Sequence, residues 1–136
     1  MEEYKLTMHD ERDTIELAQN IESEKFPNMI ICLDGELGSG KTVFTKGLAV
    51  GLNISDEVTS PTYAYLNVYG DYLYHYDCYR LSCGEDAELL GLTDYFNGDN
   101  ICVIEWSENI LDVLPNNTKK VVIEKLSEFE RKITLL

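Results

Sequence analysis

Positive charge is scarce in this sequence. It holds 11 Lys and Arg residues against 25 Asp and Glu residues, which gives a net charge of −14 at pH 7. A protein that grips nucleic acid directly needs a basic face. The balance therefore argues against direct binding of nucleic acid, but it leaves open a role in a complex that handles nucleic acid.

Long hydrophobic runs, repeats and linkers are also missing. No run of about 18 apolar residues is present, which argues against a membrane span, and the acidic start, MEEYKLTMHDERD, lacks the apolar core of a secretory signal. We therefore expect a cytoplasmic chain with no membrane association. With only three prolines and 44% hydrophobic residues, we expect one domain over residues 1–136, with a real core.

The four cysteines form no C-x-x-C pair. Cys32 and Cys102 lie in apolar runs, and we expect them to be small buried residues in a reducing compartment. Cys78 and Cys83 flank Arg80, and their spacing fits no usual metal or redox pattern. A redox pair is the less favoured interpretation of these two.

Hydrophobic patterns predict strands that alternate with helices. The runs MIICLD and ICVIE are almost continuously apolar, which is typical of strands buried on both faces of a parallel sheet. The expected strands are residues 3–8, 29–34, 62–69, 72–79, 101–105, 119–125 and 130–135, and the expected helices are 10–26, 41–51, 84–91, 94–96 and 107–114. This order, with its hairpins, indicates an α/β fold: a P-loop NTPase-like mixed sheet flanked by helices.

The turn between the two tyrosine-rich strands has a clear signal. Gly70 and Asp71 suit a two-residue hairpin turn with glycine first. Side chains alternate between the two faces of a strand. After the turn, this alternation is expected to put Tyr72, Tyr74 and Tyr76 on one face and Leu73, His75 and Asp77 on the other.

A glycine-rich loop follows the first apolar run. Its sequence, GELGSGKT, matches the whole phosphate-binding pattern G-x-x-x-x-G-K-[ST], between a strand and a helix. The glycines let the backbone bend, so that its N–H groups form an anion nest reinforced by the helix dipole. Lys41 supplies a cation for the β- and γ-phosphates, and Thr42 supplies a hydroxyl for Mg²⁺. The expected nucleotide contacts are Gly35, Glu36, Leu37, Gly38, Ser39, Gly40, Lys41 and Thr42.

The expected nucleotide is ATP, because a guanine-specific N-K-x-D stretch is absent. The alternative is a strand–turn–helix junction that matches the short pattern without binding phosphate.

Two acids are candidates to complete the site. Asp77 ends YLYHYD and Glu105 ends ICVIE, so both are expected at the carboxyl edge of the sheet, where ligands bind in open α/β folds. We expect Glu105 on the magnesium side, directly or through water, and Asp77 to orient magnesium-bound or attacking water. Both are thus candidate catalytic and metal residues, together with Lys41 and Thr42. The alternative for each acid is a strand-end cap or a surface position.

Three further residues have open interpretations. Thr62, in SPTY, would lie in a loop that senses the γ-phosphate, or in a proline turn that opens a strand. Trp106 follows Glu105 and serves either the site or ordinary packing. His75 is a sheet residue more often than a catalyst.

Five segments together resemble the TsaE (YjeE) family, the small ATPase of bacterial tRNA threonylcarbamoyladenosine synthesis. They are DGELGSGKTVFTKGLA, SPTYAYLNVY, YHYDCYRL, ELLGLTDYF and ICVIEWSE, in the right order between roughly residues 31 and 115. The resemblance implies an ATPase that uses ATP and Mg²⁺. It also implies two protein partners, TsaB and TsaD. TsaD attaches the threonylcarbamoyl group to adenosine 37 of tRNAs that read codons beginning with A, and this chain meets tRNA only through that complex.

The resemblance also implies roles for single residues. Lys41 and Thr42 would bind phosphate and Mg²⁺, and the two strand-end acids would be the acidic pair. Thr62 would be the switch threonine and Trp106 the tryptophan beside the acid. Arg131, in the tail, would lie by the adenine.

Only three arginines occur: Arg12, Arg80 and Arg131. A small-molecule kinase usually needs a lid whose arginines clamp the transferred phosphate, and an acceptor pocket. Neither is evident, so we expect weak hydrolysis by the chain alone, completed by a partner. A small-molecule kinase and a nucleotide-dependent switch remain alternatives.

The segment from Leu81 to Asp112 holds eight acids and neither Lys nor Arg. It is either a solvated acidic face or a docking face for a basic surface of a partner.

Overall fold

The computed structural model describes only part of the chain: residues 2–7, 30–35, 44–46, 49, 65–70, 72–96, 100–116, 118–125, 127 and 130–135. Residues 2–7, 130–131 and 135 are described by their backbone alone. The expected helix at 10–26, most of the glycine loop and Thr62 lie outside these ranges. The single domain over residues 1–136 stays a prediction.

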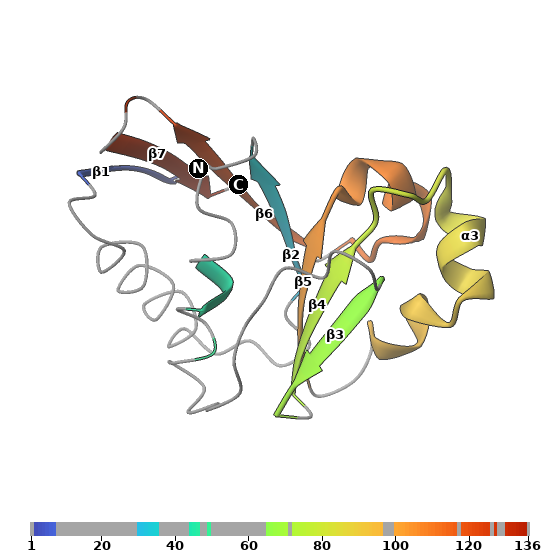
Figure 1. The fold of residues 1–136 in the computed structure, drawn as a ribbon. Helices are drawn as coiled ribbons and strands as arrows, with labels where there is room; N and C mark the ends of the chain where they lie inside the picture. Colours follow the sequence, from blue (N-terminus) through green and yellow to red (C-terminus); the bar gives the residue numbers. More distant parts are fainter. Residues whose placement is uncertain are drawn as a thin grey trace.

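Across the described ranges, seven strands form one mixed sheet in the order β1-β7-β6-β2-β5-β4-β3 (Figure 1). The central strands β6, β2, β5 and β4 run parallel, while β3, β7 and β1 add antiparallel neighbours at the two sides. The strands are β1 (Glu2–Thr7), β2 (Ile30–Gly35), β3 (Leu66–Tyr69), β4 (Leu73–Asp77), β5 (Ile101–Glu105), β6 (Lys119–Lys125) and β7 (Glu130–Leu135). The mixed sheet expected from the sequence is confirmed.

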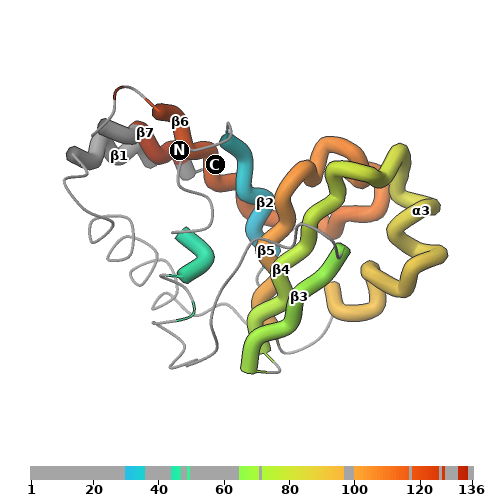
Figure 2. The backbone as a smooth tube through the Cα atoms, in the orientation of Figure 1, coloured from blue at the N-terminus to red at the C-terminus, as the bar shows by residue number. Residues whose placement is uncertain are grey.

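Helices lie on both sides of this sheet. The helix α3 (Gly84–Leu89) and the 3₁₀ helices η1 (Leu92–Tyr95) and η2 (Ser107–Val113) gather on one side. The helical residues 44–46 lie on the other (Figure 2). The expected helices at 84–91, 94–96 and 107–114 are thus present, with η1 beginning two residues early. Only residues 44–46 and 49 of the expected helix at 41–51 are described, and they are helical.

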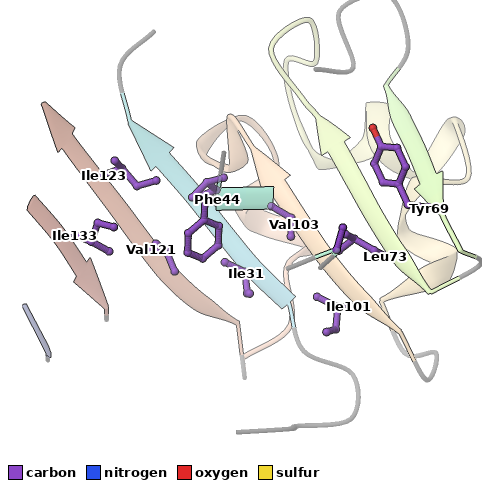
Figure 3. Close-up of a cluster of buried hydrophobic side chains, with 11 residues drawn as sticks. Ile31, Phe44, Tyr69, Leu73, Ile101, Val103, Val121, Ile123 and Ile133 are labelled. Atoms are coloured by element: carbon purple, nitrogen blue, oxygen red, sulfur yellow. The ribbon is translucent and has the colours of Figure 1, made fainter. Parts of the chain in front are cut away.

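An apolar cluster covers each face of the sheet. On one face, Ile31, Val103 and Ile123 surround the fully buried Phe44 of the helical segment (Figure 3). On the other, Ile104 packs with residues of α3, η1 and η2. Neighbouring strand residues alternate between the two clusters. Burial of each large side chain stabilises the fold by about 1.5–3 kcal/mol.

The turn between β3 and β4 is longer than predicted. Tyr69 pairs with Leu73, and the Tyr72 N–H donates a 3.2 Å hydrogen bond to the Tyr69 carbonyl. Gly70 has φ 60°, in the left-handed region that glycine tolerates. Tyr72 therefore lies in the turn and packs against the cluster of Leu73. The prediction that Tyr72 shares a face with Tyr74 and Tyr76 is wrong. Tyr72 belongs to the turn, so the alternation of side chains along the strand does not include it.

Gly84 begins α3 where the helix meets η2. Its N–H donates to Asp112 Oδ1 at 3.0 Å, and an added Cβ would lie 2.4 Å from Val113 Cγ1. We expect Gly84→Ala to lower the free energy of unfolding by about 1–3 kcal/mol, because the added methyl forces η2 away from α3. Chemical denaturation measures this loss. Glu85→Ala, at an exposed position of the same helix, is the control, and an equal loss in both variants would contradict the packing argument.

Candidate functional site at the carboxyl edge of the sheet

Three parallel strands end side by side at Gly35, Asp77 and Glu105. The register pairs Asp77 of β4 with Glu105 of β5, and it pairs Glu105 with Leu33 of β2, two residues before Gly35. Adjacent strands lie about 4.8 Å apart. Glu105 therefore lies on the strand next to β2, from which the glycine loop begins, and Asp77 lies one strand further along the same edge. Open α/β sheets bind ligands at this edge.

Both acids lie on the face of the sheet that carries the helical segment. Val103 and Leu73 pack in the same cluster as Phe44 of that segment. Glu105 is two residues beyond Val103, and Asp77 is four residues beyond Leu73. Because side chains alternate along a strand, these even steps keep both acids on this face. The helix that follows the loop and the two acids thus share one side of the sheet.

Glu105 is buried and hydrogen-bonded to a buried histidine. Its side chain is 10% exposed, and its Oε2 lies 2.5 Å from Nε2 of His75, whose side chain is 0% exposed. Such burial of a carboxylate requires hydrogen-bond partners. From the sequence, His75 was expected to be a sheet residue, with a catalytic role as the less favoured alternative, and the structure places it against the acid. Its signal in the sequence was a polar residue inside a strand, two positions before Asp77 on the same expected face.

Asp77 has a different environment. It is half-buried, and its Oδ1 accepts a 3.0 Å hydrogen bond from the Tyr79 N–H. This contact is a strand-end cap, the alternative role expected for this acid. The cap occupies Oδ1 and leaves the carboxylate partly exposed at the edge of the sheet, so capping does not exclude a role toward a ligand.

Trp106 turns the chain at the end of β5. Its backbone has φ 60° and ψ 38°, a left-handed conformation that is rare for a bulky residue. Its ring, 41% exposed, packs edge-on against Tyr79 with centroids 4.9 Å apart. Strained backbones of this kind gather at functional sites. Trp106 therefore makes the packing contact expected of it, and a role in the site stays a prediction.

Of the other predicted site residues, the structure describes only Gly35 and Arg131. Gly35 ends β2, and Arg131 lies in β7, opposite Lys125 of β6 and Leu6 of β1. Since β6 separates β7 from β2, Arg131 lies two strands away from the strand that carries Gly35. The residues outside the described ranges are Glu36, Leu37, Gly38, Ser39, Gly40, Lys41, Thr42 and Thr62. The roles of all these residues stay predictions.

The two carboxylates in register suit Mg²⁺. This ion prefers oxygen ligands and is usually bound through one or two carboxylates, with water and substrate phosphates completing its shell. The described residues contain no group of three or more His, Cys, Asp or Glu side chains that could hold a metal on their own. The donors at this edge therefore fit an ion shared with nucleotide phosphates better than an ion held by protein alone.

The family model of the threonylcarbamoyl adenosine biosynthesis protein TsaE matches residues 8–133. This chain belongs to the TsaE family. It is 42% identical over 111 residues to the tRNA threonylcarbamoyladenosine biosynthesis protein TsaE of Bacillus subtilis, an alignment that covers 79% of this chain and 69% of the relative. It is 43% identical over 108 residues to the protein of the same name from Treponema pallidum, covering 78% and 80%.

A solved structure supports the same family. The crystal structure of Bacillus subtilis YdiB superposes with a TM-score of 0.79 and 34% sequence identity, covering 98% of this chain and 84% of that one. The resemblance read from the motifs is thus confirmed, as is the P-loop NTPase-like α/β fold. Membership of the TsaE family connects the chain to tRNA threonylcarbamoyladenosine biosynthesis and to nucleotide binding. Within the described part of the chain, no helix is long and apolar enough to span a membrane.

The four cysteines of this TsaE-family chain are free thiols. Cys32, Cys78 and Cys102 are buried and Cys83 is exposed, so the expected burial of Cys32 and Cys102 is confirmed. Burial raises the pKa of Cys78 to about 12 and that of Cys102 to about 11, and it also raises the pKa of Cys32. A thiol that stays protonated reacts slowly. The contrast between Cys78 and Cys83 gives no support to a redox pair.

Thiol labelling tests this contrast. At pH 8, iodoacetamide should modify Cys83 of the folded protein first, because the three buried thiols are shielded and protonated. All four should react once guanidinium unfolds the chain. Mass spectrometry of the labelled peptides measures the order, and Cys83→Ser should remove the fast step. Labelling of Cys78 as fast as Cys83 in the folded protein would refute it.

Proposed function

We propose that this chain binds ATP with Mg²⁺ at the carboxyl edge of β2, β5 and β4, and hydrolyses it to ADP and phosphate. The observation that carries the proposal is the strand register, which sets Asp77 beside Glu105 and sets Glu105 beside the strand that ends at Gly35. The loop of residues 35–42 supplies the matching phosphate-binding sequence. The family supports nucleotide binding, and the hydrolysis step is our proposal.

Each group has a distinct proposed task. Lys41 and the loop N–H groups hold the phosphates, Thr42 and Glu105 hold Mg²⁺, and Asp77 orients the attacking or metal-bound water. Thr62 senses the γ-phosphate. Bound Mg²⁺ supplies neutralisation of the charge that develops on the phosphate oxygens. Arg131 is the proposed neighbour of the adenine.

The proposed partners are TsaB and TsaD. ATP binding and hydrolysis by this chain would support their formation of N6-threonylcarbamoyladenosine at position 37 of tRNAs that read codons beginning with A. The net charge of −14 supports contact with tRNA only through the complex. A cytoplasmic location belongs to this proposal.

The acidic segment from Leu81 to Asp112 is the proposed surface for a basic partner. Within it, α3 packs against η2, and Leu89 and Leu111 are 78% and 63% exposed. The carboxylates of Glu88 and Asp112 line a hollow of about 390 Å³ between these elements. Exposed apolar side chains within an acidic segment suit a docking site whose partner carries the opposite charge.

Phosphate release tests the hydrolysis. Glu105→Gln keeps the size of the side chain but removes its charge, so we expect ATP binding to persist and hydrolysis to fall by about 100-fold or more. The assay compares the chain alone with the chain plus TsaB and TsaD. Lys41→Ala is the control, because it removes the proposed contact between Lys41 and the phosphates. Stimulation by the two partners that Lys41→Ala abolishes is the expected result.

The same assay separates the alternatives. A kinase would yield a phosphorylated metabolite in place of free phosphate. A switch would bind ATP without needing turnover, so Glu105→Gln would still support the modification in cells. Either result would overturn the proposed hydrolytic role.

Charge reversal tests the docking surface. Glu88→Lys combined with Glu85→Lys, both at exposed positions of α3, should weaken complex formation at low salt, because the variant repels a basic partner surface. The control is Glu124→Lys, because Glu124 is exposed on β6, outside this surface. This variant has the same change in charge per site and should leave binding unchanged. Affinity measured by titration calorimetry decides, and equal effects at the two places would rule out this surface.

A further inference from the structure

The position of His75 in the sheet is unusual. The side chain is 0% exposed and lies two residues beyond Leu73, on the face that carries the cluster of Leu73 and Val103, and its register partners are Val103 of β5 and Asn67 of β3. Its Nδ1 has no hydrogen-bond partner within the described part of the chain. A buried polar atom left without a partner costs about 1–3 kcal/mol. An apolar residue would fill this position without that cost.

The one contact that explains a histidine here is the bond to Glu105. Asp77 is the register partner of Glu105, and His75 lies two residues earlier on the same strand. The side chains of His75 and Glu105 are therefore diagonal neighbours on one face of the sheet. Long side chains can bridge such a separation. Nε2 of His75 and Oε2 of Glu105 meet at 2.5 Å.

Hydrogen-bond chemistry fixes which ring nitrogen carries the proton. A carboxylate oxygen accepts, so Nε2 must donate to Oε2. With a neutral ring, Nδ1 is a bare lone pair. The geometry thus points to a proton on Nε2 that is donated to Oε2 of Glu105.

We propose that His75 is a positioning residue that holds the Glu105 side chain in one conformation for its work at the Mg²⁺–ATP site. The inference rests on the proposed function. A carboxylate at the end of a strand can rotate about its side-chain bonds, and a donor from the next strand removes that freedom. Partners that orient metal-site carboxylates in this way typically change metal affinity or activity by about 10–100-fold when they are lost.

A matched pair of variants isolates the hydrogen bond. His75→Gln keeps an N–H donor at about the reach of Nε2, whereas His75→Met has a similar length and no donor. We expect His75→Met to raise the Mg²⁺ concentration for half-maximal ATP hydrolysis, or to lower the rate, by about 10–100-fold. His75→Gln should recover most of this loss. Thermal melting of both variants shows how far folding itself is affected.

A spectroscopic readout needs neither metal nor nucleotide. The chain holds only two histidines, His9 and His75, so the spectrum of His75→Gln assigns the ring signals. Nitrogen-15 NMR of the ligand-free protein should show a proton on Nε2 of His75. Glu105→Gln should shift these signals, because it changes the acceptor.

The outcomes separate the two levels of the argument. If the wild-type chain hydrolyses ATP and the Gln and Met variants have equal Mg²⁺ dependence, the positioning role is wrong and the proposed function stands. A ring without a proton on Nε2 would also overturn the positioning role. If the wild-type chain hydrolyses no ATP, alone or with TsaB and TsaD, the proposed function falls and the inference falls with it.

Discussion

The rest of the structure depends on the burial of two parallel strands from both faces. Every residue of β5 is buried, and so are the first four residues of β2. Strands in this position must be apolar along their length, so polar chemistry is confined to the points where they end. Glu105 is the last residue of β5, and Gly35 is the last residue of β2. The same burial that stabilises the sheet therefore brings the candidate site together.

Much of the fold could be predicted because the patterns are local. The bounds of β5, β6 and β7 agree with the predicted ranges, since a continuous apolar run or an alternation defines each strand without reference to its neighbours. The turn at Gly70 shows the limit of such patterns. A glycine with positive φ is compatible with turns of different length, and only the pairing of Tyr69 with Leu73 shows that Tyr72 belongs to the turn.

The site residues that lie at strand ends could be predicted from the sequence. Those whose role depends on how the strands pair could not. Asp77 and Glu105 could be found because each follows an apolar run. His75 could not be assigned to the site, because its meaning depends on the register between β4 and β5, and these strands are separated by the helices α3 and η1. The left-handed backbone of Trp106 has no local signal either, since a tryptophan rarely adopts that conformation.

The register also gives two adjacent carboxylates different surroundings. Glu105 is buried and tied to His75, whereas Asp77 is half-buried and capped by the N–H of Tyr79. Paired acids that occupy unlike environments are suited to unlike tasks. A carboxylate held still in a dry setting fits a ligand that needs fixed geometry, as Mg²⁺ does. A carboxylate at the wet edge can contact water that enters and leaves. The division of labour proposed for the two acids thus follows from how deeply the sheet buries each one.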